Sequence, residues 1–135
     1  MPKTLKDNIK KVVAIPIQKI TATLNGSAID TKLSEMYSFD TALVDINIGD
    51  LGDQTSTTVK VEEADVSDFS AGVQVAEGGD EITVAADTQY KMEIARAKRY
   101  LRAVITITIG AGVAPSAVVC IGMILCNWAK PFPIL

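Results

Sequence analysis

The sequence RAKRYLRAVITITIGAG, residues 96–112, decides the fold class because it changes from a basic run into a β-branched run. Between Ile105 and Ile109, isoleucine alternates with threonine, and this period of two is typical of a β-strand rather than a helix. When the alternation is extended upstream, the stretch forms one long strand that begins near Arg96. We expect three residues of one face to be buried together in the core: Ile105, Ile107 and Ile109.

The basic half of this stretch carries four cations within seven residues, with Tyr100 among them. Cations interleaved with an aromatic side chain on one strand face also suit a surface for single-stranded nucleic acid. Residues 20–135, however, carry eight cations against fifteen anions, a balance of −7 that opposes binding to a polyanion. We therefore expect no nucleic-acid partner and expect these cations to face carboxylates. The cations are Arg96, Lys98, Arg99 and Arg102, and the available carboxylates are Glu62, Glu63, Asp65 and Glu93.

A membrane span is a second interpretation of this region, because residues 103–126 contain no charged side chain. The alternation of isoleucine and threonine opposes it, since it favours strands. The segment Gly110-Ala111-Gly112, followed by Pro115, also interrupts the apolar run in its middle. We therefore predict two buried strands joined by a turn, and no membrane partner.

Strand patterns recur along the rest of the chain. The clearest covers residues 41–49, where one side is formed by Ala42, Val44, Ile46 and Ile48. About eight such short strands are separated by turns rich in Gly, Asn and Asp, with no helical pattern between them. The sequence therefore predicts an all-β protein whose residues 20–130 form one antiparallel β-sandwich or barrel.

Two terminal segments flank the predicted sandwich. Residues 1–19 carry five lysines and one aspartate, and we predict an extended basic N-terminal arm in which a short helix begins near Thr4 and ends before Pro16. Residues 131–135 form an apolar C-terminal tail. Both segments are candidates for ordering on a neighbouring molecule, although a simply solvated arm is an alternative. The candidate contact residues are Lys3, Lys6, Lys10, Lys11, Phe132, Ile134 and Leu135.

The composition also narrows the possible chemistry. The chain has no histidine, which removes the commonest general base and the commonest metal ligand. Cys120 and Cys126 would lie roughly 20 Å apart on one extended strand, so we expect two buried, reduced thiols rather than a disulfide. The acidic turn that contains Asp50 and Asp53 matches no EF-hand calcium loop. The sequence therefore predicts no enzymatic activity, no cofactor and no metal.

The order of several motifs resembles a family of small tailed-phage virion proteins encoded near the major capsid protein. The motifs are Ile29-Asp30-Thr31, the apolar strand from Ala42 to Gly49, the segment Val59 to Glu63 with Phe69 nearby, and Lys98-Arg99-Tyr100 with Arg102. The resemblance covers about residues 20–130. The chain departs from the pattern in the segment from Lys32 to Tyr37 and in its basic N-terminus.

The resemblance implies a head decoration or cement protein with a β-sandwich fold, often jelly-roll-like. Such a protein is made in the host cytoplasm and binds the outer capsid surface of the virion. Its partners would be the major capsid protein, which it bridges, and further copies of itself in a dimer or trimer.

Two alternatives remain open. A neck or tail component of the virion would have a similar size and fold. A sandwich that binds glycans or a host surface would need exposed aromatic side chains, and the candidates are Tyr37, Tyr90, Tyr100 and Trp128.

Overall fold

A computed structural model describes residues 9–32, 39–52, 56–108 and 116–126, which form ten β-strands and no helix. Every strand pairing among them is antiparallel. The predicted all-β class is therefore confirmed. The strands are β1 (Ile9–Ile20), β2 (Leu24–Asn25), β3 (Ile29–Asp30), β4 (Thr41–Leu51), β5 (Ser56–Ala64), β6 (Gln74–Val75), β7 (Ile82–Thr83), β8 (Thr88–Ala95), β9 (Tyr100–Thr108) and β10 (Ala117–Cys126).

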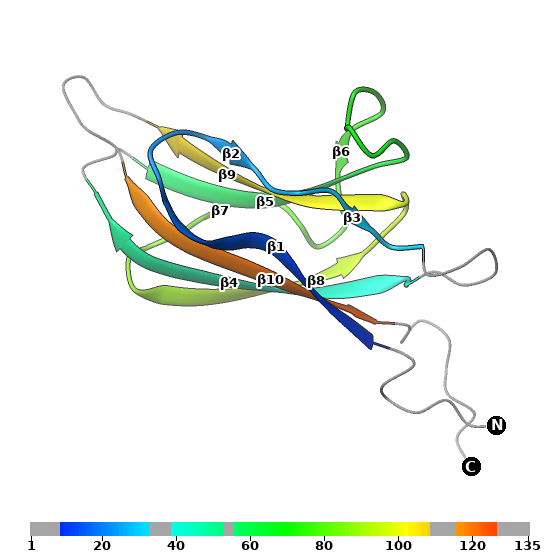
Figure 1. Ribbon diagram of the computed structural model, residues 1–135, viewed down its shortest axis with the longest axis horizontal. Coiled ribbons are helices and arrows are strands. Elements are labelled where there is room, and N and C mark those ends of the chain that lie inside the picture. Colours follow the sequence, from blue (N-terminus) through cyan, green and yellow to red (C-terminus); the bar gives the residue numbers. More distant parts are fainter. Residues whose placement is uncertain (1–8, 33–38, 53–55, 109–115, 127–135) are drawn as a thin grey trace, which may run out of the picture.

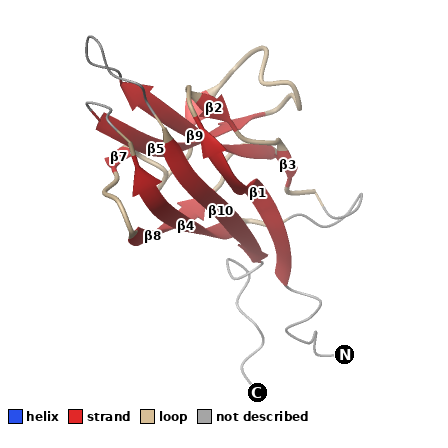
Figure 2. Cartoon of the chain, turned by 60° about the vertical axis from the view of Figure 1, so that its left-hand side comes forward, coloured by secondary structure: helices blue, strands red, loops and turns tan. Residues whose placement is uncertain are grey.

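The strands form two sheets that lie face to face (Figures 1 and 2). The first sheet has the order β1-β10-β4-β8, and the second has the order β2-β9-β5-β6. Strands β2 and β3 pair with successive parts of β9, and β6 and β7 pair with successive parts of β5, so each pair fills one strand position. Two sheets of four positions, between which the chain crosses repeatedly, are the jelly-roll arrangement that the family resemblance implied.

The core lies between the two inner faces, as the alternation predicted. Ile105 is fully buried and Ile107 is 6% exposed, whereas Ile109 lies outside the described residues. The predicted face of β4 is also buried, and β10 contributes a second buried row from the centre of the first sheet. The core residues of these two strands are Ala42, Val44, Ile46, Ile48, Ala117, Val119, Ile121, Met123 and Leu125.

The apolar region from residue 103 onward forms strands in both sheets. Its first part continues β9 in the second sheet, and its last part is β10 in the first sheet. Within the described part of the chain, no helix is long and apolar enough to span a membrane.

Strand β1 corrects the prediction for the N-terminal segment. Residues 9–20 pair with β10 along their length, so the predicted short helix was wrong and the sandwich begins at residue 9 in the described chain. The physical reason is burial, because Ala14 and Ile15 are fully buried and Ile20 is 6% exposed. Register shifts between Val13 and Ile15, and between Ile15 and Gln18, let the strand accommodate Pro16. The rest of the predicted arm, residues 1–8, lies outside the described residues.

Replacing Ile105 by alanine tests the predicted core. Because Ile105 is fully buried, Ile105→Ala should lower the free energy of unfolding by about 3 kcal/mol through lost apolar burial and a residual cavity. Urea denaturation followed by circular dichroism measures the change. Ile17→Ala is the control, because Ile17 is 77% exposed and its loss should change stability by less than about 0.5 kcal/mol. Equal effects of the two substitutions would contradict the assigned core.

Candidate functional site

The buried carboxylate of Glu63 organises the turn that contains most of the basic run. Glu63 is 1% exposed, and its Oε1 accepts hydrogen bonds from the backbone amides of Ala97 at 2.8 Å and Lys98 at 3.3 Å. Its Oε2 accepts a hydrogen bond from Gln74 Nε2 at 2.6 Å. Three donors therefore compensate the burial of this carboxylate.

This turn corrects the prediction of one long strand from Arg96 onward. Strand β8 ends at Ala95 and β9 begins at Tyr100, so residues 96–99 connect the two sheets. The period-of-two alternation of residue types continues through residues 96–99, which is why the sequence predicted a strand there. The carboxylate of Glu63, however, comes from β5 and takes up two backbone donors of the segment, which a strand ladder would otherwise use.

Each of the four cations of the basic run has an oxygen partner. Arg96 lies 3.6 Å from Asp40 and also donates to the carbonyl of Phe39. The Nζ of Lys98 donates to the carbonyl of Gly72. The guanidinium groups of Arg99 and Arg102 pair with Asp30 and Glu62, each at 2.8 Å. These cations therefore anchor one end of the sandwich. The sequence predicted that they would pair with carboxylates. Of the observed ion-pair partners, only Glu62 was among the carboxylates named from the sequence.

The pair of Arg99 and Asp30 ties β3 to the turn before β9. Arg99 Nε and Nη2 reach the two carboxylate oxygens at 2.9 and 2.8 Å, in a two-pronged geometry. These hydrogen bonds hold the pKa of the Asp30 carboxyl below its ordinary value. The backbone amide of Lys32 lowers the pKa further, whereas partial burial acts in the opposite direction.

The second sheet carries an aromatic contact on its outer face. Phe69 has a positive φ of 54° and is 8% exposed, and its ring centroid lies 4.3 Å from the guanidinium carbon of Arg102. A positive φ is unfavourable for a bulky residue, so the ring contact and the ion pair of Arg102 with Glu62 hold the loop in place. The aromatic residue thus covers the sheet instead of offering an exposed ligand platform.

The aromatic residues proposed for a glycan site are not gathered together in the described part of the chain. Tyr90 and Tyr100 are both half-buried and lie in different sheets. The hydroxyl of Tyr90 accepts a hydrogen bond from the amide of Ala85 at 2.9 Å. Tyr37 and Trp128 lie outside the described residues.

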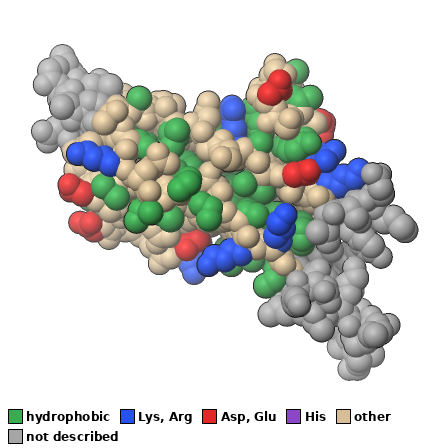
Figure 3. Space-filling model, in the orientation of Figure 1, with side chains coloured by type: hydrophobic (Ala, Val, Ile, Leu, Met, Phe, Trp, Pro, Cys, Tyr) green, Lys and Arg blue, Asp and Glu red, His purple; other side chains and the backbone are tan. Residues whose placement is uncertain are grey.

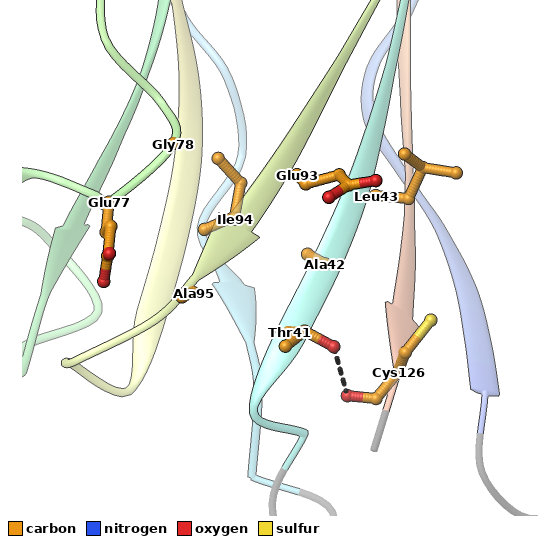
Figure 4. A pocket seen from close by; sticks show the side chains of 9 residues that line it. All are labelled: Thr41, Ala42, Leu43, Glu77, Gly78, Glu93, Ile94, Ala95 and Cys126. Carbon is orange, nitrogen blue, oxygen red and sulfur yellow. Dashed lines mark hydrogen bonds between the residues drawn. The ribbon is translucent and has the colours of Figure 1, made fainter. Parts of the chain in front are cut away.

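A hollow of about 750 Å³ lies at the end of the first sheet where β10 finishes (Figure 4). Figure 4 shows Leu43 and Glu93 on the side of the sheet away from Ile94, and the Thr41 hydroxyl donating to the carbonyl of Cys126 at 3.1 Å. The loop that carries Glu77 runs beside the edge strand, where Glu77 bridges to Ala95. The lining residues are Thr41, Ala42, Leu43, Glu77, Gly78, Glu93, Ile94, Ala95 and Cys126.

Gly78 closes one side of this hollow and needs to be glycine. Its φ is +86°, and a Cβ at this position would lie 1.8 Å from the carbonyl oxygen of Glu93. The backbone of the loop can therefore approach β8 only because no side chain is present.

The outer face of the first sheet is unusually apolar at its centre. The outward residues of β10 are Val118, Cys120, Gly122 and Ile124, and all four are partly exposed. On β1, Val13 is 57% exposed and Ile17 is 77% exposed. In Figure 3, hydrophobic side chains lie across the middle of the molecule, where Figure 1 places β1 and β10.

The residues predicted as contacts are only partly described. Lys10 and Lys11 are exposed at the start of β1. Cys120 is half-buried and Cys126 is buried, and neither forms a disulfide. Among the described residues, no group of three His, Cys, Asp or Glu side chains could hold a metal ion. The candidates outside the described residues are Lys3, Lys6, Phe132, Ile134 and Leu135.

Three solved structures superpose on this chain. The SPBc2 prophage-derived protein YomS superposes with a TM-score of 0.51 and 11% identity, over 87% of this chain and 92% of that chain. PirA superposes with a TM-score of 0.43 and 17% identity, over 92% of this chain and 97% of that chain. A chain of infectious bursal disease virus, Gx strain, superposes with a TM-score of 0.49 and 9% identity, over 93% of this chain and 35% of that chain. The similarity to YomS shows a shared fold.

No protein-family model matches the sequence, and no curated protein sequence matches it.

Replacing Glu63 tests its role in the turn. Glu63→Ala leaves two backbone amides and Gln74 without their acceptor, so the free energy of unfolding should fall by at least about 2 kcal/mol. Glu63→Gln retains an acceptor oxygen and should lose less. Chemical denaturation measures both, with Glu81→Ala as the control because Glu81 is an exposed carboxylate. A loss for Glu63→Ala no larger than for Glu81→Ala would show that the turn forms without the carboxylate.

Acid titration tests the pair of Asp30 and Arg99. The pKa of Asp30 is lower in the folded chain, so the pair stabilises the fold above the unfolded pKa of about 3.9, and this contribution disappears as the pH falls through the folded pKa. Asp30→Asn should therefore be less stable than the native chain at pH 7, and the difference should shrink toward pH 2. The loss should stay below about 1 kcal/mol, because the two side chains are 43% and 41% exposed.

Urea midpoints measured between pH 7 and pH 2 provide this comparison, and Asp80→Asn, in an exposed turn, is the matched control. A difference between Asp30→Asn and the native chain that stays constant over the whole range would refute the assigned pair.

Proposed function

We propose that this protein is a non-enzymatic structural component of a tailed-phage virion that decorates the outer capsid surface and stabilises it by bridging major capsid protein subunits. The observation that carries the proposal is the jelly-roll fold, which the chain shares with the prophage-derived protein YomS over 87% of its length. The order of motifs that resembles small phage virion proteins supports the same role. Jelly rolls also occur in viral capsid domains.

The described surface suits a stabilising protein better than a catalyst. The charged side chains at one end of the sandwich are used in internal ion pairs, from Arg96 with Asp40 to Arg102 with Glu62. The sequence has no histidine to act as a general base. A rigid sandwich that makes modest contacts many times around a closed shell gains strength through multivalency.

The termini are the proposed capsid contacts. Strands β1 and β10 pair along the first sheet, so residues 9 and 126 emerge at the same end of the sandwich (Figure 1). The lysines at positions 3, 6, 10 and 11 would meet an acidic surface, and Phe132, Ile134 and Leu135 would fill apolar sites. Both terminal segments thus leave the sandwich on the side that we assign to the shell.

Electron cryomicroscopy of the parent particle, with and without this protein, tests the assignment. Extra density distributed over the shell, together with lower thermal stability of particles that lack the protein, is the expected result. Density confined to the tail vertex would replace capsid decoration by a role in the neck or tail. Identical particles in the two preparations would remove the virion role.

Deleting residues 1–8 tests the basic segment without removing any residue of β1. The shortened protein should remain folded, occupy purified capsids several-fold less and show a weaker dependence of binding on salt, because Lys3 and Lys6 are lost. Binding assays at increasing salt concentration measure this. The matched variant Lys3→Gln with Lys6→Gln keeps the length of the chain and separates charge from length. Full occupancy with unchanged salt dependence in both variants would exclude a role for the segment.

A further inference from the structure

The outer face of the first sheet contains a row of residues with opposite charges at its two ends. The register places Lys11 beside Ile124, Ile124 beside Leu43, and Leu43 beside Glu93. Lys11 and Glu93 are exposed on the two edge strands, and the apolar pair between them is partly exposed. We call these four residues the central row.

The neighbouring row toward the end of the sheet has no charge. It consists of Ile9, Cys126, Thr41 and Ala95, which lie side by side across the four strands. The hollow at the end of the sheet lies along these two rows, since Thr41, Leu43, Glu93, Ala95 and Cys126 all line it. The result is an apolar strip with a depression, bordered by charge.

The two borders of this strip differ in sign. The border on β1 carries Lys11, which is exposed, whereas Lys10 lies beside the buried Leu125 on the other face of the sheet. The border on β8 carries Glu93, and Glu77 lies beside it through its bridge to Ala95. One surface therefore contains both a basic and an acidic margin at a fixed separation of three strand spacings, roughly 14 Å.

Such a surface is complementary to a copy of itself. We propose that a second copy of the chain docks on this face, with a two-fold axis parallel to the strands and passing between β10 and β4. This rotation reverses the row, so that Lys11 of each copy faces Glu93 of the other and Ile124 faces Leu43. The two sheets pack face to face with aligned strands, as sheets do in sandwich cores.

Addition of a strand to the edge of the sheet fits the geometry less well. Edge strand β1 contains Pro16, which has no amide donor, and two register shifts. The carbonyl of Ala14 already accepts a hydrogen bond from the amide of Ser27 at 3.2 Å. Edge strand β1 is therefore protected against pairing, whereas none of the described residues covers the outer face.

The docking face ends at a polar network farther along the sheet. Asp45 accepts hydrogen bonds from Gln89 Nε2 at 2.6 Å and from Asn47 Nδ2 at 3.3 Å. These polar groups, together with Lys91 beside Asp45, make the β4 and β8 part of the sheet beyond the central row suited to contact with water, whereas Val13 on β1 is apolar and exposed. We therefore place the interface at the end of the sheet that carries the hollow.

Charge reversal in the isolated full chain tests the docking mode. The native chain should form dimers by sedimentation equilibrium. Lys11→Glu places Glu opposite Glu in both contacts, and Glu93→Lys places Lys opposite Lys, so each variant should raise the dimer dissociation constant by at least about tenfold. An equimolar mixture of the two variants should recover dimerisation, because both contacts of the heterodimer then join opposite charges.

Lys19→Glu and Glu81→Lys are the matched controls, since they make the same charge changes on exposed residues outside the two rows. They should dimerise like the native chain. Leu43→Ser should also weaken the dimer without unfolding the chain, because Leu43 is only partly buried.

The proposal would be overturned by a native chain that is monomeric at all concentrations, by a dimer that the charge reversals leave unchanged, or by a mixture that does not recover association. A native monomer that dimerises only after deletion of residues 131–135 would also overturn it, because the tail would then be the occupant of the face. The measurement needs no capsid, so its outcome is independent of the proposed decoration role.

Discussion

Burial of the two inner sheet faces against each other is the interaction on which the rest of the structure depends. Each of the long strands β4, β5, β9 and β10 has one buried side, and neither sheet can bury this side alone. Strand β10 lies at the centre of the first sheet, between β1 and β4, and Val119, Ile121, Met123 and Leu125 are at most 1% exposed. Strand β9 has the corresponding place in the second sheet, where Ile105 is fully buried. The chain crosses between the sheets repeatedly, so the connecting segments must span from one sheet to the other without disturbing the packed faces.

The end of the sandwich that contains residues 96–99 shows how polar groups adapt to that constraint. The chain leaves β8 in one sheet and enters β9 in the other, and the backbone amides of this crossing need acceptors. Glu63 supplies them from the interior, while Arg99 and Arg102 extend outward to Asp30 and Glu62. A basic run that resembles a ligand-binding patch in the sequence is therefore part of the scaffold.

The proposed docking surface lies on the outer face of the first sheet and follows from the same alternation. Residues between the buried positions of β4 and β10 must point outward, and here they include Leu43 and Ile124. Apolar side chains on a solvent-facing sheet side commonly mark contact with another protein. The proposed self-association and the proposed attachment of the termini to a capsid use neighbouring parts of this end of the molecule. A decoration protein could therefore contact its shell and its own copy together.

The sequence by itself determined the all-β class, the strands at residues 41–49 and 118–126, and the burial of Ile105 and Ile107, because a period of two is a local property of the backbone. The jelly-roll topology was implied only by the resemblance of motif order to phage virion proteins. Only the tertiary structure decided that residues 9–20 form a strand, since their burial depends on β10, more than ninety residues away. The turn at residues 96–99 likewise depends on Glu63 of another strand. The central row also depends on tertiary structure, because Lys11, Ile124, Leu43 and Glu93 become neighbours only through strand register.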